Sequence, residues 1–173
     1  MRRLILLRHA KSDRPPGSSD RERPLNPRGR RVAPAVGAYL ASEGLVPDLA
    51  LISPATRTQE TWALVAEHVA APTETVPDIY EALPEEVLAA IRRAPDTAGT
   101  LIVVGHNPGI GELAAALVGE GPRKLRSRLA LEFPTAALAV IDFEGDSWAG
   151  VGPGTGRLER FVRPRDIDPD LGG

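Results

Sequence analysis

Leu4-Ile5-Leu6-Leu7-Arg8-His9 is the stretch that decides the fold of this chain and gives the first indication of its chemistry. Four consecutive apolar residues are typical of a short strand buried on both faces of a sheet. The run stops at an arginine and a histidine, so both are expected at the carboxyl edge of the sheet, where open α/β sheets bind ligands. Arg8 suits a phosphate or carboxylate, and His9 can act as a nucleophile or proton carrier. Alone, the pair is equally compatible with a structural hydrogen-bonding pair.

A second strand-to-helix junction repeats this pattern. The apolar residues 49–52 are followed by Ser53-Pro54-Ala55-Thr56-Arg57. Ser53 is expected to be the N-cap and Pro54 the first helical residue. Arg57 then lies in the first helical turn, where the helix dipole disfavours a cation but free N–H groups favour an anion. Arg57 therefore indicates either a bound anion or a solvated surface arginine.

A third junction places another histidine at a strand end. Residues 101–104 are apolar, and Gly105-His106-Asn107-Pro108 follows them. A glycine lets backbone approach a ligand closely, and Asn107 before Pro108 is expected to cap the next helix. His106 alone would be read as a core histidine, but it ends its strand as His9 does.

The other elements follow from periodicity and from helix start and stop signals. We expect a long loop over residues 10–26, which in compact domains is often functional. The expected further helices run from Pro27 to Gly44, from Pro84 to Arg93 and from Pro108 to Gly119, and the further strands cover 73–76, 136–142 and 157–162. The basic run Arg123, Lys124, Arg126 and Arg128 either binds phosphate or, as we favour, forms a solvated face.

Alternating strands and helices predict an α/β fold, a three-layer sandwich with a mostly parallel central sheet and helices on both faces. A single domain is expected over residues 1–163, followed by a loose C-terminal tail over 164–173. One edge of the sheet should then gather Arg8, His9, Arg57 and His106. Two arginines and one imidazole would clamp a dianion, and the second imidazole would be free to attack it.

Bulk composition excludes several classes of function. The 173 residues suffice for one domain with a substantial core, and the 42% apolar and 25% charged residues are ordinary for a globular protein. With a net charge of −2, the chain has no overall positive charge that would attract nucleic acid or an anionic membrane. The absence of cysteine excludes thiol catalysis, and three histidines without carboxylate partners argue against a zinc site. We expect no metal, no cofactor and, without a signal-peptide pattern, a cytoplasmic protein.

Taken together, Leu7-Arg8-His9-Ala10, Ser53 to Arg57 and Gly105 to Pro108 resemble the motifs of the histidine phosphatase (phosphoglycerate mutase-like) superfamily. The short length and the segment Asp20-Arg21-Glu22-Arg23-Pro24-Leu25-Asn26 resemble its SixA-type phosphohistidine phosphatase branch. The chain departs at Ala10, where the superfamily has glycine, and at Gln59-Glu60 before Thr61, where the family has glutamine just before the threonine. The second change is expected to be peripheral.

The resemblance implies roles for particular residues. His9 would be the nucleophile, and Arg8, Arg57 and a protonated His106 would bind the transferring phosphoryl group. Glu81 occupies a loop position where many members carry their proton donor, and Asp20 is the alternative; we favour Glu81. Arg23 would extend the substrate pocket or form a salt bridge. His68 is excluded, because it lies roughly 16 Å along the helix from Arg57.

The function expected from these residues is a metal-independent phosphatase that acts on a phosphomonoester or phosphoramidate, including protein phosphohistidine, through a phosphohistidine intermediate on His9. The alternatives are a phosphomutase of the same superfamily and a catalytically inactive phospho-ligand binding module. The expected partner is a phosphorylated substrate, either a phosphohistidine protein or a small metabolite. The oligomeric state cannot be read from the sequence.

Overall fold

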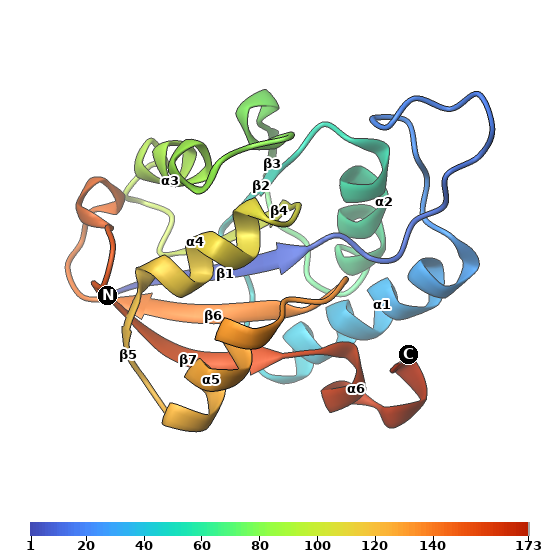
Figure 1. Cartoon of the computed structure of the whole chain (residues 1–173). Helices are drawn as coiled ribbons and strands as arrows, with labels where there is room; N and C mark the ends of the chain where they lie inside the picture. Colours follow the sequence, from blue (N-terminus) through green and yellow to red (C-terminus); the bar gives the residue numbers. More distant parts are fainter. Residues whose placement is uncertain (173) are drawn as a thin grey trace.

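The computed structural model describes residues 1–172 and shows a seven-stranded mixed sheet with helices on both faces (Figure 1). The strands are β1 (Arg2–Arg8), β2 (Leu49–Ile52), β3 (Thr73–Thr75), β4 (Thr100–Gly105), β5 (Val118–Glu120), β6 (Leu138–Phe143) and β7 (Gly156–Val162). The helices are α1 (Pro27–Ser42), α2 (Thr56–Val65), α3 (Pro84–Arg92), α4 (Gly109–Leu117), α5 (Arg123–Leu131) and α6 (Pro164–Ile167), with 3-10 turns η1 (Pro77–Ile79), η2 (Trp148–Gly150) and η3 (Pro169–Leu171). The expected three-layer α/β fold is confirmed.

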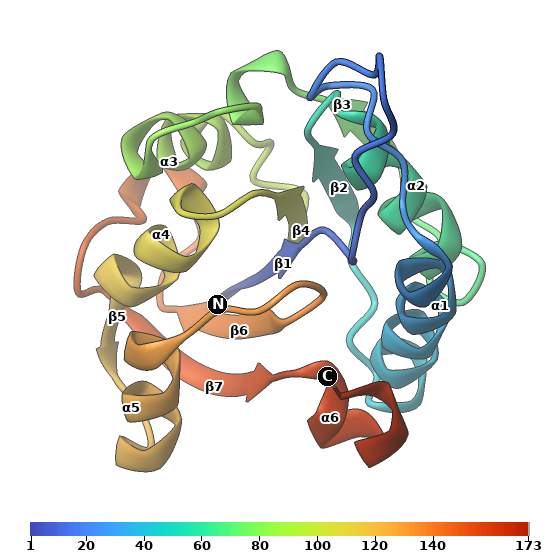
Figure 2. The same ribbon diagram turned by 45° about the vertical axis from the view of Figure 1, so that its right-hand side comes forward.

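The sheet separates two apolar cores. Its strand order is β3-β2-β4-β1-β6-β7-β5, and α1, α2 and α6 cover one face while α3, α4 and α5 cover the other (Figure 2). Alternate residues of β1 explain the two cores, because Leu4 and Leu6 pack with one set of helices and Ile5 and Leu7 with the other. All four are fully buried, as expected for a central strand.

Parallel pairing brings the predicted junctions to one edge. β1 pairs with β4 in parallel, and β4 pairs with β2 in parallel, so the three strands end on the same side of the molecule. In this register Arg8 lies beside Gly105. The antiparallel neighbour β6 borders β1 on its other side, and the loop before it also reaches this edge. The topology therefore gathers His9, Ser53 and His106 at adjacent strand ends.

Several element boundaries differ from the expectations. Asn26 caps α1 as expected, since its side chain accepts a hydrogen bond from the N–H of Gly29 at 2.8 Å. Helix α2, in contrast, begins at Thr56 with Ala55 as its N-cap, so the assignment of Ser53 as the cap was wrong. Helix α4 begins at Gly109, although Asn107 still accepts a hydrogen bond from the N–H of Gly111.

Two elements were missed altogether. The basic run from Arg123 to Arg128 lies in helix α5, of which only Leu129 is buried. The segment that begins at Val118 is the short strand β5, paired with β7, where a continuation of the preceding helix was expected. Neither element has a regular apolar pattern long enough to be recognised from sequence.

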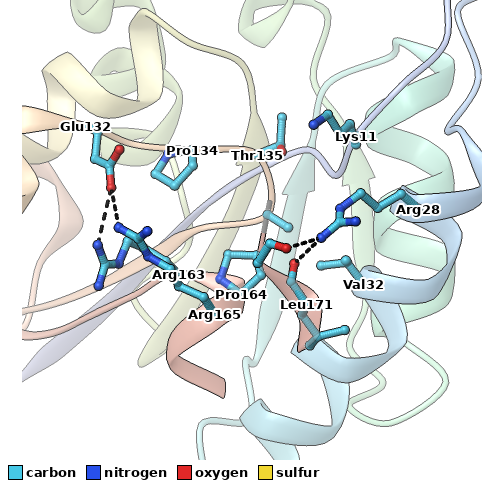
Figure 3. Close-up of a pocket in the computed structure, with 12 residues that line it drawn as sticks. Lys11, Arg28, Val32, Glu132, Pro134, Thr135, Arg163, Pro164, Arg165 and Leu171 are labelled. Carbon is cyan, nitrogen blue, oxygen red and sulfur yellow. Dashed lines mark hydrogen bonds and ion pairs between the residues drawn. The ribbon is translucent and has the colours of Figure 1, made fainter. Parts of the chain in front are cut away.

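The C-terminal segment is packed against the domain, and the expectation of a loose tail does not describe residues 164–172. Helix α6 and turn η3 place Ile167 and Leu171 against the core beside α1. Arg28 of α1 donates hydrogen bonds to the backbone carbonyls of Leu171 and Gly172 (Figure 3). Gly173, the last residue of the expected tail, lies outside the described residues. Within residues 1–172, no helix combines the length and the apolar character needed to cross a membrane.

The long loop after β1 is fastened to α1 and α2. Glu60 accepts a hydrogen bond from the N–H of Leu25 at 2.9 Å and pairs with Arg30, so the glutamate that was expected to be peripheral anchors this loop. Gly29 is packed so closely under the loop that a Cβ atom there would lie 2.1 Å from the carbonyl oxygen of Lys11. A glycine is required at this contact because backbone cannot yield as a flexible side chain can.

We therefore predict that Gly29→Ala lowers the free energy of unfolding by about 2 kcal/mol or more, as overpacking against backbone does. Helix propensity alone predicts the opposite sign, a gain of up to about 1 kcal/mol. Gly150→Ala is the matched control, since nothing lies within 4 Å of its added Cβ. Urea unfolding of both variants checks the prediction, and an unchanged or raised stability for Gly29→Ala would contradict it.

Candidate active site

His9 follows β1 and is held in one tautomer. Its Nδ1 lies 2.7 Å from the carbonyl oxygen of Ala10. Because a carbonyl oxygen can only accept, Nδ1 carries the proton and Nε2 keeps its lone pair. The N–H of Ala10 donates to the hydroxyl of Thr61, which in turn donates to the carbonyl of Arg57. This chain of bonds fixes the backbone under His9 and leaves the lone pair of Nε2 available.

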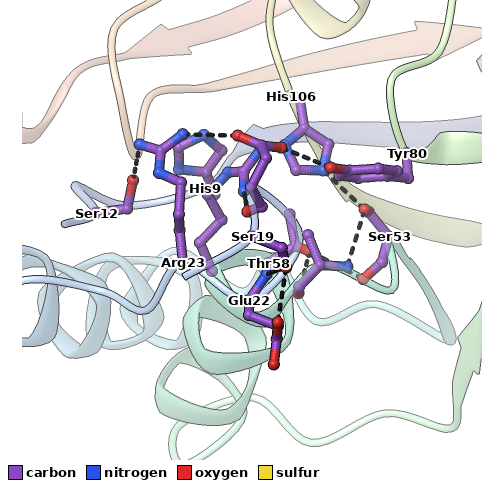
Figure 4. A network of polar contacts seen from close by, with 12 residues as sticks. His9, Ser12, Ser19, Glu22, Arg23, Ser53, Thr58, Tyr80 and His106 are labelled. Carbon is purple, nitrogen blue, oxygen red and sulfur yellow. Dashed lines mark hydrogen bonds and ion pairs between the residues drawn. The ribbon is translucent and has the colours of Figure 1, made fainter. Parts of the chain in front are cut away.

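His106 lies opposite His9 and is oriented by Ser53. The two imidazole centroids are 5.3 Å apart, and Nε2 of His106 lies 2.7 Å from the hydroxyl oxygen of Ser53 (Figure 4). Nδ1 of His106 is buried and has no hydrogen-bond partner among the described residues. Ser53 is thus a site residue that the sequence analysis assigned to helix capping instead.

Arg8 and Arg57 complete the group of four. Arg8 donates to the carbonyl of Phe133 at 3.1 Å, and the Nε atoms of both arginines are buried without a partner in the described structure. The side chain of Arg57 is only 8% exposed. Burial, followed by the charge of Arg57, lowers the pKa of Arg8. Two guanidinium groups with unused donors, that of Arg57 buried and that of Arg8 half-buried, are an arrangement that a phosphate or similar dianion would satisfy.

Asp20 supplies the negative charge that pairs with Arg57 and Arg23 in the free protein. Its carboxylate accepts hydrogen bonds from the hydroxyl of Tyr80 at 2.6 Å, from Arg23 at 3.1 Å and from Arg57 at 3.1 Å. The bond from Tyr80 is the main cause that lowers the pKa of Asp20 far below its usual value. Asp20 is therefore fully ionised near neutral pH and has no proton to donate in this arrangement.

Tyr80 and Glu81 follow turn η1 beside this network. Tyr80 stacks edge-on against His106, with centroids 5.6 Å apart, and the bond to Asp20 raises its pKa to about 12. Tyr80 was missed by the sequence analysis, because a lone aromatic residue in a loop carries no pattern. Glu81 is exposed, has a positive φ of 53°, and does not line the pocket around His9.

The pocket around His9 is strongly cationic. It has a volume of about 400 Å³, and its charged lining residues are Arg8, Lys11, Arg14, Arg23 and Arg57. No carboxylate within residues 1–172 lines it. Lys11 and Arg14 were not anticipated, because charged residues in an irregular loop give no indication of which way they point. The pocket is built for an anion with more than one charge.

Both imidazoles are neutral in the free protein near pH 7. Burial, with neighbouring cations adding to it, lowers the pKa of His9 to about 4. Burial is also the main cause that lowers the pKa of His106 to about 3. The neutral form suits His9 as a nucleophile, but it corrects the expectation of a protonated His106, which would need a bound dianion to raise its pKa.

Two sequence features lie outside the site. His68 is exposed and does not line the pocket, in line with its exclusion. The basic residues of α5 line a separate surface hollow that includes Arg123 and Arg126. No cluster of three or more His, Cys, Asp or Glu side chains suited to a metal ion occurs in the described part of the chain.

We predict that the ring signals of His9 and His106, followed by NMR in a His68→Gln variant, titrate between about pH 3 and 4. The unfolded chain takes up these protons near pH 6.5, whereas the folded chain does not, so the free energy of unfolding should fall as the pH drops below about 6.5. A titration midpoint near 6.5 for His9 in the folded protein would contradict this account.

Comparison with known sequences identifies the family. The model of the histidine phosphatase superfamily (branch 1) matches residues 4–86, which include Arg8, His9 and Arg57. An uncharacterized protein of Mycobacterium tuberculosis, MT1313, is 38% identical over 161 residues, which cover 92% of this chain and 100% of that protein. A chloroplastic protein of Arabidopsis thaliana, At3g52155, is 34% identical over 180 residues, covering 94% of this chain and 78% of the relative.

Solved structures agree with the sequence comparison. A candidate phosphohistidine phosphatase SixA from Nakamurella multipartitia is 29% identical with a TM-score of 0.85, and covers 94% of this chain and 96% of its own. A candidate SixA from Agrobacterium tumefaciens is 30% identical with a TM-score of 0.80, and covers 94% of this chain and 98% of its own. With these matches and the strand-end motifs, the chain belongs to the histidine phosphatase superfamily and, within it, to the SixA-type branch.

Proposed function

We propose that this protein is a phosphatase that transfers a phosphoryl group from its substrate to Nε2 of His9 and then to water. The observation that carries the proposal is the tautomer of His9, whose Nδ1 is committed to the carbonyl of Ala10 while Nε2 faces a cationic pocket. A neutral imidazole with a fixed lone pair beside two guanidinium groups is what nucleophilic attack on a phosphate dianion requires.

In the first step, the lone pair of Nε2 forms a bond to phosphorus while the bond from phosphorus to the leaving group breaks. The positive charge that develops on the ring is stabilised by the bond from Nδ1–H to the carbonyl of Ala10. Arg8 and Arg57 stabilise the phosphoryl oxygens, and Arg57 must exchange Asp20 for the phosphate as it does so. His106 can donate from Nδ1 to the same oxygens.

In the second step, water attacks the phosphohistidine, the bond between phosphorus and Nε2 breaks, and phosphate leaves. The arginines supply the positive charge at both steps, and we propose that no metal ion takes part. The proposed substrates are phosphomonoesters and phosphoramidates. Protein phosphohistidine is included, because the similar structures from two bacteria are described as candidate phosphohistidine phosphatases.

We predict that His9→Ala abolishes turnover, because the other imidazole of the pocket, His106, has its Nε2 engaged by Ser53 and is assigned above as a donor from Nδ1. His68→Ala, which removes an exposed imidazole outside the pocket, is the matched control and should retain full activity. The wild-type protein should form an acid-labile, base-stable phosphoenzyme that His9→Ala lacks. Trapping with labelled substrate and release of phosphate from a panel of esters and phosphoramidates measure both effects. Substrate binding without turnover by the wild-type protein would favour the inactive binding module.

Chelators should leave wild-type activity unchanged, since the pocket carries its own positive charge in the side chains of five residues. The rate of phosphate release is measured before and after dialysis against EDTA. A loss of activity that a divalent cation restores would show that the arginines do not suffice.

We propose that Glu81, which directly follows the Tyr80 packed against His106, is the proton donor for the leaving group. Because it is exposed and outside the pocket in the free protein, its side chain has to turn toward the leaving group when substrate binds. Glu81→Gln should slow hydrolysis of an alkyl phosphate, which expels a basic alkoxide, by about 10²-fold or more. It should slow hydrolysis of phosphohistidine far less, because a protonated imidazole leaves readily without help from an acid. Comparison of kcat/KM for the two substrates measures this difference.

Asp20→Asn distinguishes the two acidic residues. Because Asp20 is ionised and bonded to Arg57 and Arg23, its loss should affect both substrates alike by disturbing phosphate binding. If Asp20→Asn shows the selective loss and Glu81→Gln shows none, then Asp20 is the donor after it separates from the arginines.

A further inference from the structure

A second cavity adjoins the cationic pocket and shares Lys11 and Thr135 with it. Its volume is about 240 Å³. The backbone of Ala136, which forms part of its wall, donates a hydrogen bond to the carbonyl of His9 at 3.0 Å. The two spaces are therefore neighbours on the same loop, and a ligand bound by its phosphate next to His9 can extend past Lys11 into the second cavity.

The wall of this cavity is built by the segment that follows β7. Pro164 and Leu171 of that segment face Val32 of α1 and Pro134, and these residues make the middle of the cavity apolar (Figure 3). Arg28 holds the segment in place through the carbonyls of Leu171 and Gly172. The cavity is thus formed before any ligand binds, which reduces the entropic cost of binding.

The charges around the cavity are unevenly distributed. On one side, Glu132 pairs with Arg163 and Arg165, so these charges are largely compensated (Figure 3). On the other side, the ammonium group of Lys11 makes no hydrogen bond or ion pair with any described residue, and Lys11 lines both spaces. An ammonium group left without a carboxylate partner beside an apolar cavity favours a ligand that brings an anion to it.

We propose that this cavity binds the part of the substrate beyond the phosphate, and that this part is an apolar, ring-sized group with an anionic substituent that pairs with Lys11. The proposal rests on the function proposed above and adds the class of substrate. The size is appropriate, because a cavity of about 150 Å³ accepts a benzene ring. The remaining volume accommodates a carboxylate or a second phosphate near Lys11.

Binding of three probes tests the proposal: inorganic phosphate, phenyl phosphate and 4-carboxyphenyl phosphate. The measurements use the His9→Ala background, in which the probes are not consumed, and calorimetry gives each Kd. The Kd of inorganic phosphate measures binding to the cationic pocket alone. Phenyl phosphate adds the contact of a ring with the apolar part of the cavity, and 4-carboxyphenyl phosphate adds the pairing of a carboxylate with Lys11.

Two variants separate these contributions. Lys11→Met nearly keeps the length of the side chain and removes its charge. It should raise the Kd of 4-carboxyphenyl phosphate by at least about threefold more than the Kd of phenyl phosphate, which is the size expected for an exposed ion pair. Leu171→Trp fills the cavity. It should weaken the binding of both aryl phosphates and leave the Kd of inorganic phosphate unchanged. Leu131→Trp, at an exposed position outside the cavity, is the matched control and should change none of the three.

The outcomes distinguish this inference from the proposed function. Equal changes for all three probes in Lys11→Met and Leu171→Trp would overturn the subsite, even if the wild-type protein hydrolyses phosphate esters. Selective changes would support the subsite, even if turnover of the panel failed and with it the proposed function. If Leu171→Trp no longer binds inorganic phosphate, that variant has lost its fold. The test of the subsite then rests on Lys11→Met alone, through the ratio of its effects on the Kd of 4-carboxyphenyl phosphate and of phenyl phosphate.

Discussion

The parallel pairing of β1 with β4 is the constraint on which the rest of the site depends. It sets Arg8 beside Gly105, so that the residue after each strand is a histidine and the two rings come within 5.3 Å. A shift of one residue in this register would turn the apolar side chains of β1 toward the wrong cores and separate the histidines. The buried strand β1 therefore fixes the position of His9 relative to His106, and the polar side chains at its end need little further rearrangement.

The positive charges concentrated at this edge repel one another, and the carboxylate of Asp20 compensates part of this repulsion. The guanidinium groups of Arg8 and Arg57 repel each other, and burial lowers the pKa of both imidazoles, so the histidines stay neutral. Asp20 bridges Arg23 and Arg57 and is itself fixed by Tyr80. The loop that carries Asp20 is anchored in turn by Glu60, which links a residue of α2 to the arrangement of the pocket.

Much of this arrangement could be predicted from the sequence, because apolar runs, strand-end polar residues and helix signals depend on local patterns. The four central residues Arg8, His9, Arg57 and His106 follow from such patterns, and the fold follows from the alternation of strands and helices. Ser53 was misread because a hydroxyl that caps a helix and a hydroxyl that binds an imidazole look alike in sequence.

The contacts that could not be predicted join residues far apart in the chain. Tyr80 donates a hydrogen bond to Asp20, which lies 60 residues earlier in the sequence. Arg28 bonds to the C-terminal segment, which lies more than 140 residues later. Sequence periodicity does not indicate such contacts. The missed helix α5 shows the same limit, because only one of its residues is buried in the core. Side-chain direction in loops, as at Lys11 and Arg14, is likewise set by tertiary packing.

The carboxylate of Asp20 has a consequence for the end of the proposed reaction. Inorganic phosphate, the product of that reaction, would be held tightly by bare guanidinium groups, and its departure would then limit the rate. Because Asp20 bonds to Arg57 in the free protein, departing phosphate would be exchanged for an anion of the protein, and Arg57 would not be left without a counter-charge. On this proposal, Asp20 competes with the product for Arg57 and so limits product inhibition.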